Sequence, residues 1–590
     1  MVKHGGTIIV DTLLKIFNEI FNGATAPGIW YSSIIVPIPK KKSKTIELAE
    51  FRPISLTCIP AKLFESIMSQ RLLQVSDTEN WLPVYQNGFR KKMSTIDNLI
   101  VLQQEIHTAF QKKEVLLAAF LDIKKAYDSV DRKILHDRFD ELRVNGKLKK
   151  WIQNFLLHKR EGVVRFKNCI SKKYIFRNGV PQGSPISPLL FNIYVSGLKE
   201  LRPKKISQFA DDIVIWEKSQ DFPKAERKLN DSLEKINVWA KTLALEFSQT
   251  KSLVIPFTRK HIKATPLIKL DGLEINVSDS AKYLGVTFDK NLCWTAHVTE
   301  IIKTARKRMF LLKRMSNRKN GLNQTILLKL YTYTIRPILE YGAVVWGDIS
   351  KKNQDALNSV QQSAITTALG VMRISKRKHV NFEGQIWPLN LRREQQLIRK
   401  WRDMKGNSTY DFLCNMPSEK RLINSFRKSF IERVVELSKE LNLCLAEMWS
   451  LKNSEIEAIF QRKFIASADA YEQDYFNLKR PKLAYVSFGA TRNESSVWHQ
   501  ARLNMLPLNN ILHRIKRAEN ENCTACNCSE TTMHFIFECP MYKEIWEKNP
   551  KLLEIRKNRP KEILCLKKSD AHKRKVSKIL FFSAKRRKLN

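Results

Sequence analysis

The stretch ISQFADDIVIW, residues 206–216, has the form of a β-hairpin with two acidic residues, Asp211 and Asp212, at its turn. A third acidic residue, Asp122, lies near the end of the strand-like stretch AAFLDI. Mg²⁺ prefers carboxylate oxygens, so a few Asp residues at strand ends suffice to bind it. Nucleotidyl transfer requires two such ions about 3.5–4 Å apart. Because an Asp-Asp pair in a turn is by itself more often structural, the neighbouring motifs decide its meaning.

The motifs around this hairpin occur in a recognisable order. They are FRPISL (51–56), LDIKKAYDSVD (121–131), NGVPQGSPISPLLFNIYV (178–195), FADDIVIW (209–216) and KYLGVTFD (282–289). The last four resemble the successive core motifs of reverse transcriptases, KYLGVTFD being similar to the hairpin that grips the primer. FRPISL and the preceding VPIPKKKSK resemble the fingers motifs that contact the incoming triphosphate. The resemblance implies an RNA-directed DNA polymerase with two Mg²⁺ ions at its catalytic site.

The resemblance assigns a role to each acidic residue and to the Pro-Gln-Gly loop at 181–183, which lies between Asp122 and Asp211 in the sequence. Asp122 and Asp211 would bind the metal, and Asp212 would complete the acidic turn. Gln182 and Gly183 would contact the nucleotide and the template, because glycine allows a close approach of the backbone.

Three basic residues would bind the triphosphate by the same resemblance. Arg52 can fork onto phosphate, whereas Lys40 acts as a point charge. Lys251, in LEFSQTKSLVIPF, falls where the family has a lysine near the leaving pyrophosphate. Lys40 belongs to a basic cluster, 40–44, and lysines in such clusters commonly form a solvated surface.

Two features favour a DNA product over an RNA product. Viral RNA-dependent RNA polymerases usually carry Gly-Asp-Asp where this chain has Phe-Ala-Asp-Asp. Tyr127 lies five residues after Asp122, where reverse transcriptases hold an aromatic ring against the sugar. A ring beneath C2′ leaves no room for a 2′-hydroxyl, the group that distinguishes RNA from DNA. The competing interpretation of Tyr127 is a core side chain.

The stretch LLKLYTYTIRPILEYGAVVW (327–346) resembles the thumb of jockey-like non-LTR (LINE) retrotransposon enzymes. We therefore predict an α+β right-hand polymerase with fingers, palm and thumb, followed by a mostly helical region and a small zinc-binding module. The predicted parts are fingers and palm at 1–290, thumb at 291–349, a helical basic region of unknown role at 350–490, a Cys/His module at 491–546 and a basic tail at 547–590. A basic stripe, Lys303 to Arg314, would contact phosphates of the template–primer duplex.

A Cys/His-rich segment follows near the end of the chain. Cys523, Cys526, His534 and Cys539 have plausible spacing for a tetrahedral Zn²⁺ site, and Cys528 could replace Cys526. CTACN and ETTMHFIFECPMYKEIW are similar to the C-terminal Cys/His module of LINE polyproteins, which implies zinc here as well.

The net charge of +45, from 103 Lys and Arg against 58 Asp and Glu, indicates a polyanionic partner. The expected partners are an RNA template, a DNA primer or target DNA, and deoxynucleoside triphosphates. No apolar run reaches the ~18 residues of a membrane span, and no signal peptide is apparent. We expect an intracellular protein with reduced cysteines. It would be nuclear during target-primed integration, with assembly in the cytoplasm as the alternative.

The alternative hypothesis is a catalytically decayed or domesticated remnant that only binds nucleic acid. The three aspartates argue against it. An RNA-dependent RNA polymerase is disfavoured by Phe-Ala-Asp-Asp and Tyr127. Related elements usually place an endonuclease before the polymerase, and here the polymerase motifs begin near Met1. We therefore expect extension of a supplied primer without nicking of intact plasmid.

Overall fold

The computed structural model describes residues 4–40, 47, 50–197, 205–260, 265–317, 320–414, 427–476, 478, 491–548, 550, 563–564 and 569–586. The chain forms two compact units. The first comprises Met1–Leu292 with Gly406–Ser429, and the second comprises Cys293–Lys405 with Phe430–Asn590. The named strands of the described residues all lie in the first unit, which is therefore mixed α/β, whereas the second is helical.

The first unit is built on a five-stranded sheet in the order β12-β9-β3-β8-β7. These strands are β3 (Val115–Asp122), β7 (Ile206–Phe209), β8 (Asp212–Ser219), β9 (Leu253–Phe257) and β12 (Asn276–Val277). The predicted strand near 118–123 and the hairpin at 206–216 are confirmed: they are β3 and β7–β8, and β3 pairs with β8 antiparallel along its whole length.

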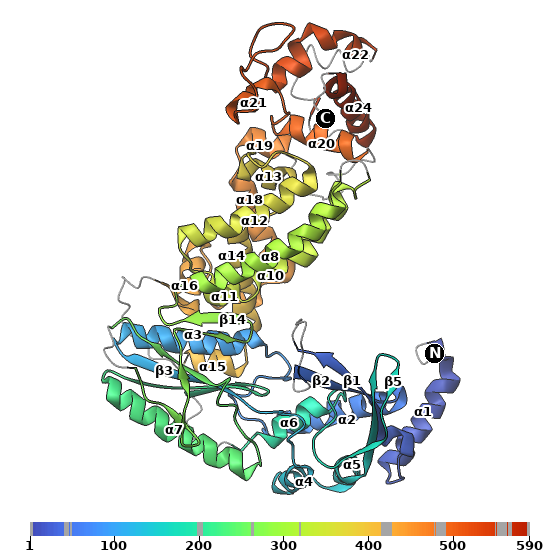
Figure 1. Ribbon diagram of the computed structural model, residues 1–590, viewed down its shortest axis with the longest axis vertical. Helices are drawn as coiled ribbons and strands as arrows, with labels where there is room; N and C mark the ends of the chain where they lie inside the picture. Colours follow the sequence, from blue (N-terminus) through green and yellow to red (C-terminus); the bar gives the residue numbers. More distant parts are fainter. Residues whose placement is uncertain are drawn as a thin grey trace. The chain divides into compact units, whose positions relative to one another are not determined.

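Helices cover both faces of this sheet, because its central strand is apolar on both sides. In β3 the residues from Val115 to Leu121 are all buried. Its odd-numbered residues share a core with Leu229 and Leu233 of α7 (Phe222–Thr242). The helix α3 (Thr95–Gln111) lies on the opposite face, as Figure 1 shows. Side chains alternate along a strand, so a two-sided core requires apolar residues at every position.

A second sheet, in the order β2-β1-β4-β5 with β6 beside β4, carries the N-terminal motifs. Its strands are β1 (Ser32–Pro39), β2 (Phe51–Leu56), β4 (Arg160–Phe166), β5 (Cys169–Ile170) and β6 (Tyr174–Phe176). The other elements of the first unit are α1 (Gly6–Phe21), η2 (Gly28–Tyr31), α2 (Ile59–Thr78), α4 (Arg132–Glu141), α5 (Gly146–Leu157), α6 (Ser187–Tyr194), β10 (Lys269–Leu270), β11 (Leu273–Glu274), β13 (Ser280–Tyr283), β14 (Val286–Asp289) and α15 (Ser408–Cys414). The predicted segment KYLGVTF forms the hairpin β13–β14.

A segment distant in sequence completes the first unit. The helix α15 packs against α3. Asn407 donates a hydrogen bond to Asp97 Oδ1 at 3.5 Å, and Ser408 donates one to the carbonyl of Val84 at 3.3 Å. The sequence analysis gave no sign of this return, because no motif marks the stretch around 406–414.

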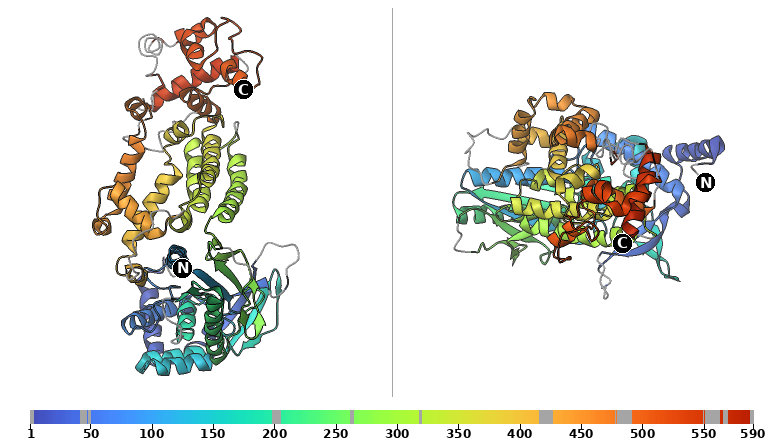
Figure 2. Two further views of the ribbon diagram at one scale, coloured as in Figure 1. Left: turned by 90° about the vertical axis from the view of Figure 1, so that its left-hand side faces the viewer. Right: turned by 90° about the horizontal axis from the view of Figure 1, so that it is seen from above.

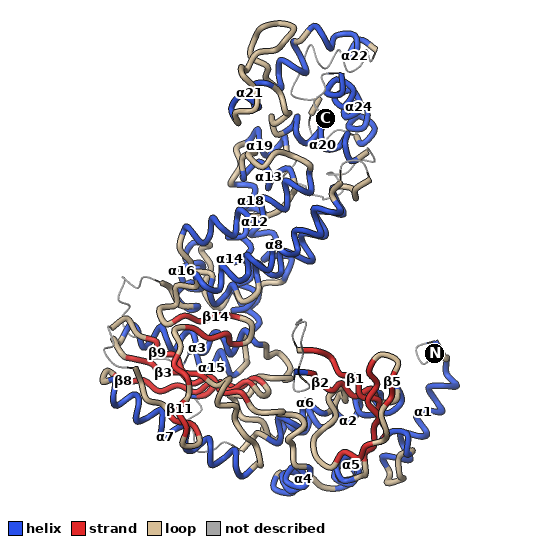
Figure 3. The backbone as a smooth tube through the Cα atoms, viewed as in Figure 1, coloured by secondary structure: helices blue, strands red, loops and turns tan. Residues whose placement is uncertain are grey.

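The second unit is a stack of helices, seen as blue coils in Figure 3 and from two further sides in Figure 2. Its elements are α8 (Thr295–Met315), α9 (Gln324–Leu330), the π-helical turn η5 (Tyr331–Ile335), α10 (Arg336–Glu340), α11 (Ala343–Trp346), α12 (Lys351–Leu369), α13 (Arg377–Glu383), α14 (Leu389–Asp403), α16 (Phe430–Glu440), α17 (Glu447–Ser450), α18 (Asn453–Ala466), α19 (Ala470–Tyr475), α20 (Arg492–Arg502), α21 (Asn509–Arg514), η7 (His534–Glu538), η8 (Pro540–Tyr542), α22 (Lys543–Glu547) and α24 (Asp570–Arg586).

The basic end of the chain contributes to this unit. Val576 and Leu580 of α24 are fully buried, and α24 packs against α20. They belong to one hydrophobic core with Cys523 and Cys539. The ranges 491–546 and 547–590, which the sequence analysis separated, therefore share a core. Within the described residues, no helix has the length and hydropathy needed to cross a membrane.

Candidate active site and Cys/His cluster

The strand register places Asp122 directly opposite Asp212. Asp122 is the last residue of β3 and Asp212 is the first of β8, and the two are paired Cα to Cα. Directly opposed residues of an antiparallel pair point to the same face, with Cβ atoms about 4.5–5.5 Å apart. Asp211 precedes them in the turn, so three carboxyl groups gather at one end of the sheet. The prediction that Asp211 and Asp212 both lie in the turn is wrong, because the two-residue loop Ala210–Asp211 leaves Asp212 free to pair with Asp122.

The turn holds an unusual backbone conformation. Ala210 has φ +56°, in the left-handed region that favours glycine. The buried Gln86 side chain satisfies it on both sides: Oε1 accepts from Ala210 N–H at 2.9 Å, and Nε2 donates to the Ala210 carbonyl at 3.4 Å. Gln208 Nε2 donates to the same carbonyl at 3.0 Å. A conformation that costs about 1–3 kcal/mol persists where its surroundings hold it, as these three bonds do here.

Glycine is required beside this turn. A Cβ atom on Gly88 would lie 2.5 Å from the backbone nitrogen of Ala210. The Gly88 carbonyl accepts a hydrogen bond at 2.6 Å from the buried Asn192 of α6. Gln86, Gly88 and Asn192 thus fix the position of the acidic turn, and the sequence analysis missed all three. The available signal was the polar, glycine-containing run Gln86-Asn87-Gly88, which directly follows the apolar stretch 81–85.

Burial and the neighbouring carboxyl groups raise the pKa of Asp211 and of Asp212. Burial raises the pKa of Asp211, its own backbone hydrogen bond and Arg52 oppose the rise, and Asp122 adds to it. Partial burial raises the pKa of Asp212 to about 6, and the charges of Asp211 and Asp122 contribute to the rise. Asp212 is exposed to water on one side, and the like charges of Asp211 and Asp122 disfavour its ionised form. A divalent cation would relieve this repulsion, so the donor set fits Mg²⁺.

The three aspartates are more widely spaced than the ligands of a single small ion. In the described part of the chain, two groups of three or more Cys, His, Asp or Glu have their ligand atoms all within 4.8 Å of one another. One is a Cys/His group, and the other is the largely exposed trio His136, Asp137 and Asp140. The aspartates form no such group.

Tyr127 lies beside the acidic turn. Its ring stacks on Phe191 of α6, with centroids 5.1 Å apart and planes 14° apart. Burial raises the pKa of Tyr127, and the nearby charge of Asp211 raises it further, so the phenol stays protonated at neutral pH. The stacking on Phe191 holds the Tyr127 ring in one orientation beside the acidic turn.

The Pro-Gln-Gly loop lies against β2. Ser55 N–H donates to the Gln182 carbonyl at 2.7 Å, and Gln182 Nε2 donates to Asp128 Oδ1 at 3.0 Å. Gly183 has φ +132°, and a Cβ atom there would lie 2.6 Å from the Ser55 carbonyl oxygen. The glycine is therefore needed both for its backbone conformation and for the close approach to β2.

The predicted basic residues reach the same region. Lys251 Nζ lies 3.3 Å from Asp122 Oδ2, and Ser252 Oγ accepts a hydrogen bond from Asp122 N–H at 3.3 Å. Arg52 is close enough to Asp211 for its charge to lower the pKa of that carboxyl, and Lys40 acts likewise on Asp128. The rest of the basic cluster, 41–44, lies outside the described residues. The polymerase-site residues predicted from the sequence thus lie in one part of the first unit.

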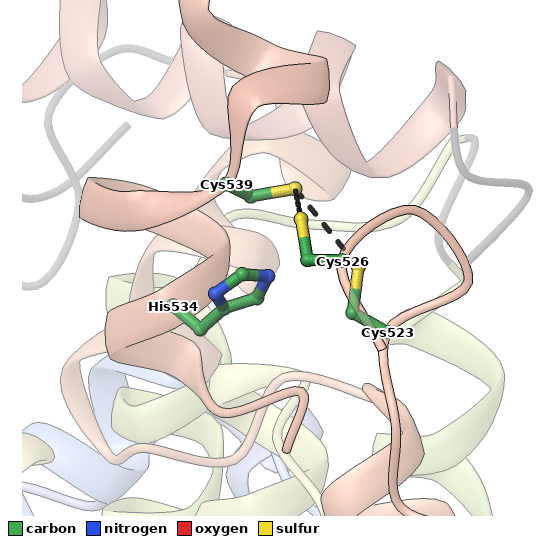
Figure 4. A group of neighbouring side chains, drawn as sticks. All are labelled: Cys523, Cys526, His534 and Cys539. Carbon is green, nitrogen blue, oxygen red and sulfur yellow. Dashed lines mark hydrogen bonds between the residues drawn. The ribbon is translucent and has the colours of Figure 1, made fainter. Parts of the chain in front are cut away.

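The second unit brings together the four predicted zinc ligands. The ligand atoms of Cys523, Cys526, His534 and Cys539 all lie within 4.8 Å of one another, and Figure 4 shows the thiols converging beside the imidazole. Cys539 Sγ lies 4.0 Å from Cys523 Sγ and 3.8 Å from Cys526 Sγ. Two sulfurs bound at 2.3 Å in a tetrahedron lie about 3.8 Å apart, so the thiols fit Zn²⁺. Cys528 is exposed, outside the group, with its Sγ 3.3 Å from His534 Nδ1.

Part of this chain matches a known protein family. Residues 38–288 match the family described as reverse transcriptase (RNA-dependent DNA polymerase). The chain is 30% identical over 365 residues to a probable RNA-directed DNA polymerase from transposon BS of Drosophila melanogaster, which covers 60% of this chain and 40% of that protein. It is 26% identical over 369 residues to the RNA-directed DNA polymerase from mobile element jockey of the same species, covering 61% and 40%.

Other relatives match over more of the chain. The retrovirus-related Pol polyprotein from type-1 retrotransposable element R2 of Nasonia vitripennis is 24% identical over 597 residues, covering 90% of this chain and 50% of that protein. Among solved structures, apo telomerase from Candida tropicalis matches at 11% identity and a TM-score of 0.34, covering 77% of this chain and 74% of that one. That likeness is too low to bear on the fold.

Proposed function

We propose that this chain, whose residues 38–288 form a reverse transcriptase domain related to those of non-LTR retrotransposons, synthesises DNA on an RNA template. The observation that carries the proposal is the pairing of Asp122 with Asp212 at the end of β3 and β8, with Asp211 in the adjoining turn. Its relatives are longer, since the chain spans about 40% of the first of them. The proposed reaction is therefore the reaction of the reverse transcriptase domain at residues 38–288.

In the proposed reaction the carboxylates of Asp122 and Asp211 would hold two Mg²⁺ ions, and Asp212 would add negative charge beside them. The ions supply activation of the primer 3′-hydroxyl and neutralisation of the triphosphate. The ring of Tyr127, fixed on Phe191, would exclude a 2′-hydroxyl from the sugar position. Gln182 and Gly183 would align the nucleotide with the template.

Cations of the chain would hold the triphosphate. Arg52 lies within electrostatic reach of Asp211, Lys40 acts on Asp128, and Lys251 lies 3.3 Å from Asp122. Each is thus near the place where phosphates would meet the metal-binding carboxylates. Arg52 can make two parallel hydrogen bonds to one phosphate, whereas the lysines neutralise charge as points.

The test is deoxynucleotide incorporation on poly(rA)·oligo(dT) with Mg²⁺. Asp211→Asn keeps the shape of the side chain and removes the ligand charge, so we expect incorporation to fall by several orders of magnitude. The matched control is Asp231→Asn on the exposed side of α7, which should leave the rate unchanged. Binding of the template–primer should survive in both variants, because phosphate contacts come from Lys and Arg. Near-wild-type synthesis by Asp211→Asn would overturn the proposal.

The residues of the second unit extend this function to nucleic-acid binding. The stripe on α8 that includes Lys303, Arg306, Lys307, Lys313 and Arg314 would contact phosphates of the template–primer duplex. The proposed partners are RNA template, DNA primer or target, and deoxynucleoside triphosphates. Target-primed synthesis on chromosomal DNA would take place in the nucleus.

We further propose that the Cys/His cluster binds one Zn²⁺ through Cys523, Cys526, His534 and Cys539. Zinc would stabilise the small core that these residues share with α20 and α24. Purified chain should contain about one zinc per molecule. Cys526→Ser should lose it, and the neighbouring Cys528→Ser, the matched control, should keep it. If zinc is retained in Cys526→Ser and lost in Cys528→Ser, the fourth ligand is Cys528 and not Cys526.

A further inference from the structure

A polar cavity lies within the second unit and includes none of the residues assigned to catalysis or to zinc binding. Its volume is about 250 Å³. It is lined by Arg336, Gln385, Ile386, Trp387, Arg392, Gln395, Arg399, Glu457 and Gln461. Arginine, glutamine and tryptophan dominate the lining, and Trp387 with Arg392 comes from IWPLNLRREQQL (386–397), a stretch that the proposed function leaves unused.

The cavity carries an excess of positive charge. Glu340 is buried and pairs with Arg392, whose Nε and Nη2 lie 2.9 and 3.1 Å from its two oxygens. Arg336 reaches the same carboxylate at 3.6 Å. Glu340 can neutralise only one guanidinium. The lining holds three arginines against one acid, the exposed Glu457, and Arg399 lies within electrostatic reach of Glu457 and of the exposed Asp403. Burial and then the charge of Arg392 lower the pKa of Arg399 and of Arg336, as expected of crowded cations.

Two buried polar atoms of the lining have no hydrogen-bond partner among the described residues. They are the donor Nε of Arg399 and the acceptor Oε1 of Gln385. Gln385 cannot turn away, because its Nε2 donates to the carbonyls of Phe382 and Phe476 at 3.0 and 2.7 Å. An unpaired buried polar group destabilises the folded chain, so a ligand that pairs both atoms would be favoured.

The aromatic side chain limits what that ligand can be. Trp387 Nε1 donates to Gln461 Oε1 at 3.0 Å, and Gln461 Nε2 donates to the Leu478 carbonyl at 2.8 Å, so the indole is fixed by a chain of hydrogen bonds. A fixed ring is a stacking surface for a planar group. A simple anion would use the arginines but neither the indole nor the unpaired acceptor. An unpaired nucleobase uses all three, because its edge carries donors and acceptors and its phosphate is anionic.

We propose that this cavity binds one unpaired nucleotide of a single-stranded nucleic acid, with the base against Trp387 and the phosphate toward Arg336 and Arg399. The cavity is smaller than the ~300–1,000 Å³ of sites that enclose drug-sized ligands, which suits one nucleotide. A base within a duplex has its pairing edge occupied, so the site would distinguish single strands from duplexes. This binding is independent of the polymerase site, which lies in the first unit.

The first experiment maps contacts on the wild-type full chain. A short single-stranded RNA containing 5-bromouridine is cross-linked with ultraviolet light, and the modified peptides are identified by mass spectrometry. We expect a cross-link in the peptide that carries Trp387, reduced by excess unlabelled single strand and not by duplex. Cross-links confined to peptides without any residue of the cavity would overturn the proposal. No variant is needed, so a folding defect cannot obscure this result.

The second experiment measures affinity by fluorescence anisotropy with labelled single-stranded RNA, single-stranded DNA and duplex. Arg399→Gln should weaken single-strand binding roughly ten- to hundred-fold, as for loss of a hydrogen bond to a charged group, and lower the salt slope by about one. Duplex binding should not change. The matched control is Arg462→Gln, an exposed arginine next to Gln461 on α18, which should behave as wild type.

The two single strands distinguish the possible sources of the nucleotide. A larger loss for RNA than for DNA would assign the site to RNA through its 2′-hydroxyl, and equal losses would assign it to base and phosphate alone. An equal loss for single strands and duplex would overturn the proposal in favour of a general anion site. Unaltered thermal unfolding of Arg399→Gln serves as the folding check, and Arg399→Lys is the second variant if it fails.

Discussion

At the scale of single residues, the acidic site depends on groups that do not themselves react. Asp122, Asp211 and Asp212 were identifiable from the sequence because their chemistry and order are distinctive. Gln86 was not, because a buried glutamine has no sequence pattern and its value lies in bonding both sides of Ala210. A strand register and a side-chain contact over more than one hundred residues are properties of the folded chain. Residue types were thus predictable, and their supports were not.

Tyr127 is expected to select the sugar. Tyr127→Val opens the space beneath C2′, so the use of ribonucleotides relative to deoxyribonucleotides should rise roughly ten- to two-hundred-fold, the range for one small group in a pocket. The measurement is the ratio of kcat/KM for each nucleotide. Tyr333→Val, at an exposed tyrosine of the second unit, is the control. An unchanged ratio in an active Tyr127→Val enzyme would argue for a purely structural tyrosine.

Gln86 is expected to position the turn. Gln86→Ala leaves the buried Ala210 N–H without its partner and frees a left-handed residue to relax. Small displacements of reacting groups cost up to about 100-fold in rate, so kcat should fall roughly ten- to hundred-fold while KM and template–primer affinity stay close to wild type. Gln74→Ala on the exposed face of α2 is the control. Because partial unfolding would also lower the apparent kcat alone, kcat is expressed per molecule of folded enzyme, and an unchanged kcat in folded Gln86→Ala would contradict the positioning role.

At the scale of elements, periodicity predicted the parts that bury one or two faces. The unbroken apolar run of β3 and the polar-tipped hairpin β7–β8 were predictable because burial requires those patterns. The helix α24 was missed because its charged residues dominate its composition, although Val576 and Leu580 are spaced for one buried stripe. A short apolar stripe in a basic segment becomes visible only against its partner, α20.

Three helices of the second unit, α13, α19 and α20, and the segment at Leu564 meet at a buried charge network. Glu383 of α13 accepts from Arg502 Nε at 2.9 Å and lies 2.5 Å from His499 Nδ1, both on α20. Arg502 also donates to the carbonyls of Leu564 and of Tyr475 in α19. Burial alone would raise the pKa of Glu383, but Arg502 and His499 lower it to about 2.

The network should make stability depend on pH. A carboxyl with a lowered folded pKa contributes stability that is present above its unfolded pKa of about 4.3 and is lost as the pH falls toward 2. Glu383→Gln should therefore cost about 3–5 kcal/mol at pH 7, the range for breaking a buried pair. The gap to wild type should narrow at pH 3. Urea unfolding at both pH values measures it, with exposed Glu519→Gln as control, and a gap independent of pH would contradict the ionised pair.

At the scale of the whole molecule, the net charge of +45 is a property of the entire sequence and not of any single contact. Basic side chains that bind phosphates release counterions from the nucleic acid. The logarithm of the binding constant for any nucleic acid should therefore fall steeply and linearly with the logarithm of the salt concentration. Anisotropy with one duplex across a salt series measures the slope. A flat dependence would mean that internal acids neutralise most of the basic surface.

The return of residues 406–414 to the first unit also sets a schedule for biosynthesis. A ribosome that has reached Leu292 has made most of that unit, yet α15, which packs on α3, is still about 120 residues away. At 5–20 residues per second the nascent chain waits roughly 6–25 s with α3 uncovered. We expect a product ended at Leu292 to aggregate or recruit chaperones more readily than the full chain. Supplying 406–429 on a short linker should restore its yield of soluble protein, because the missing surface then arrives at once.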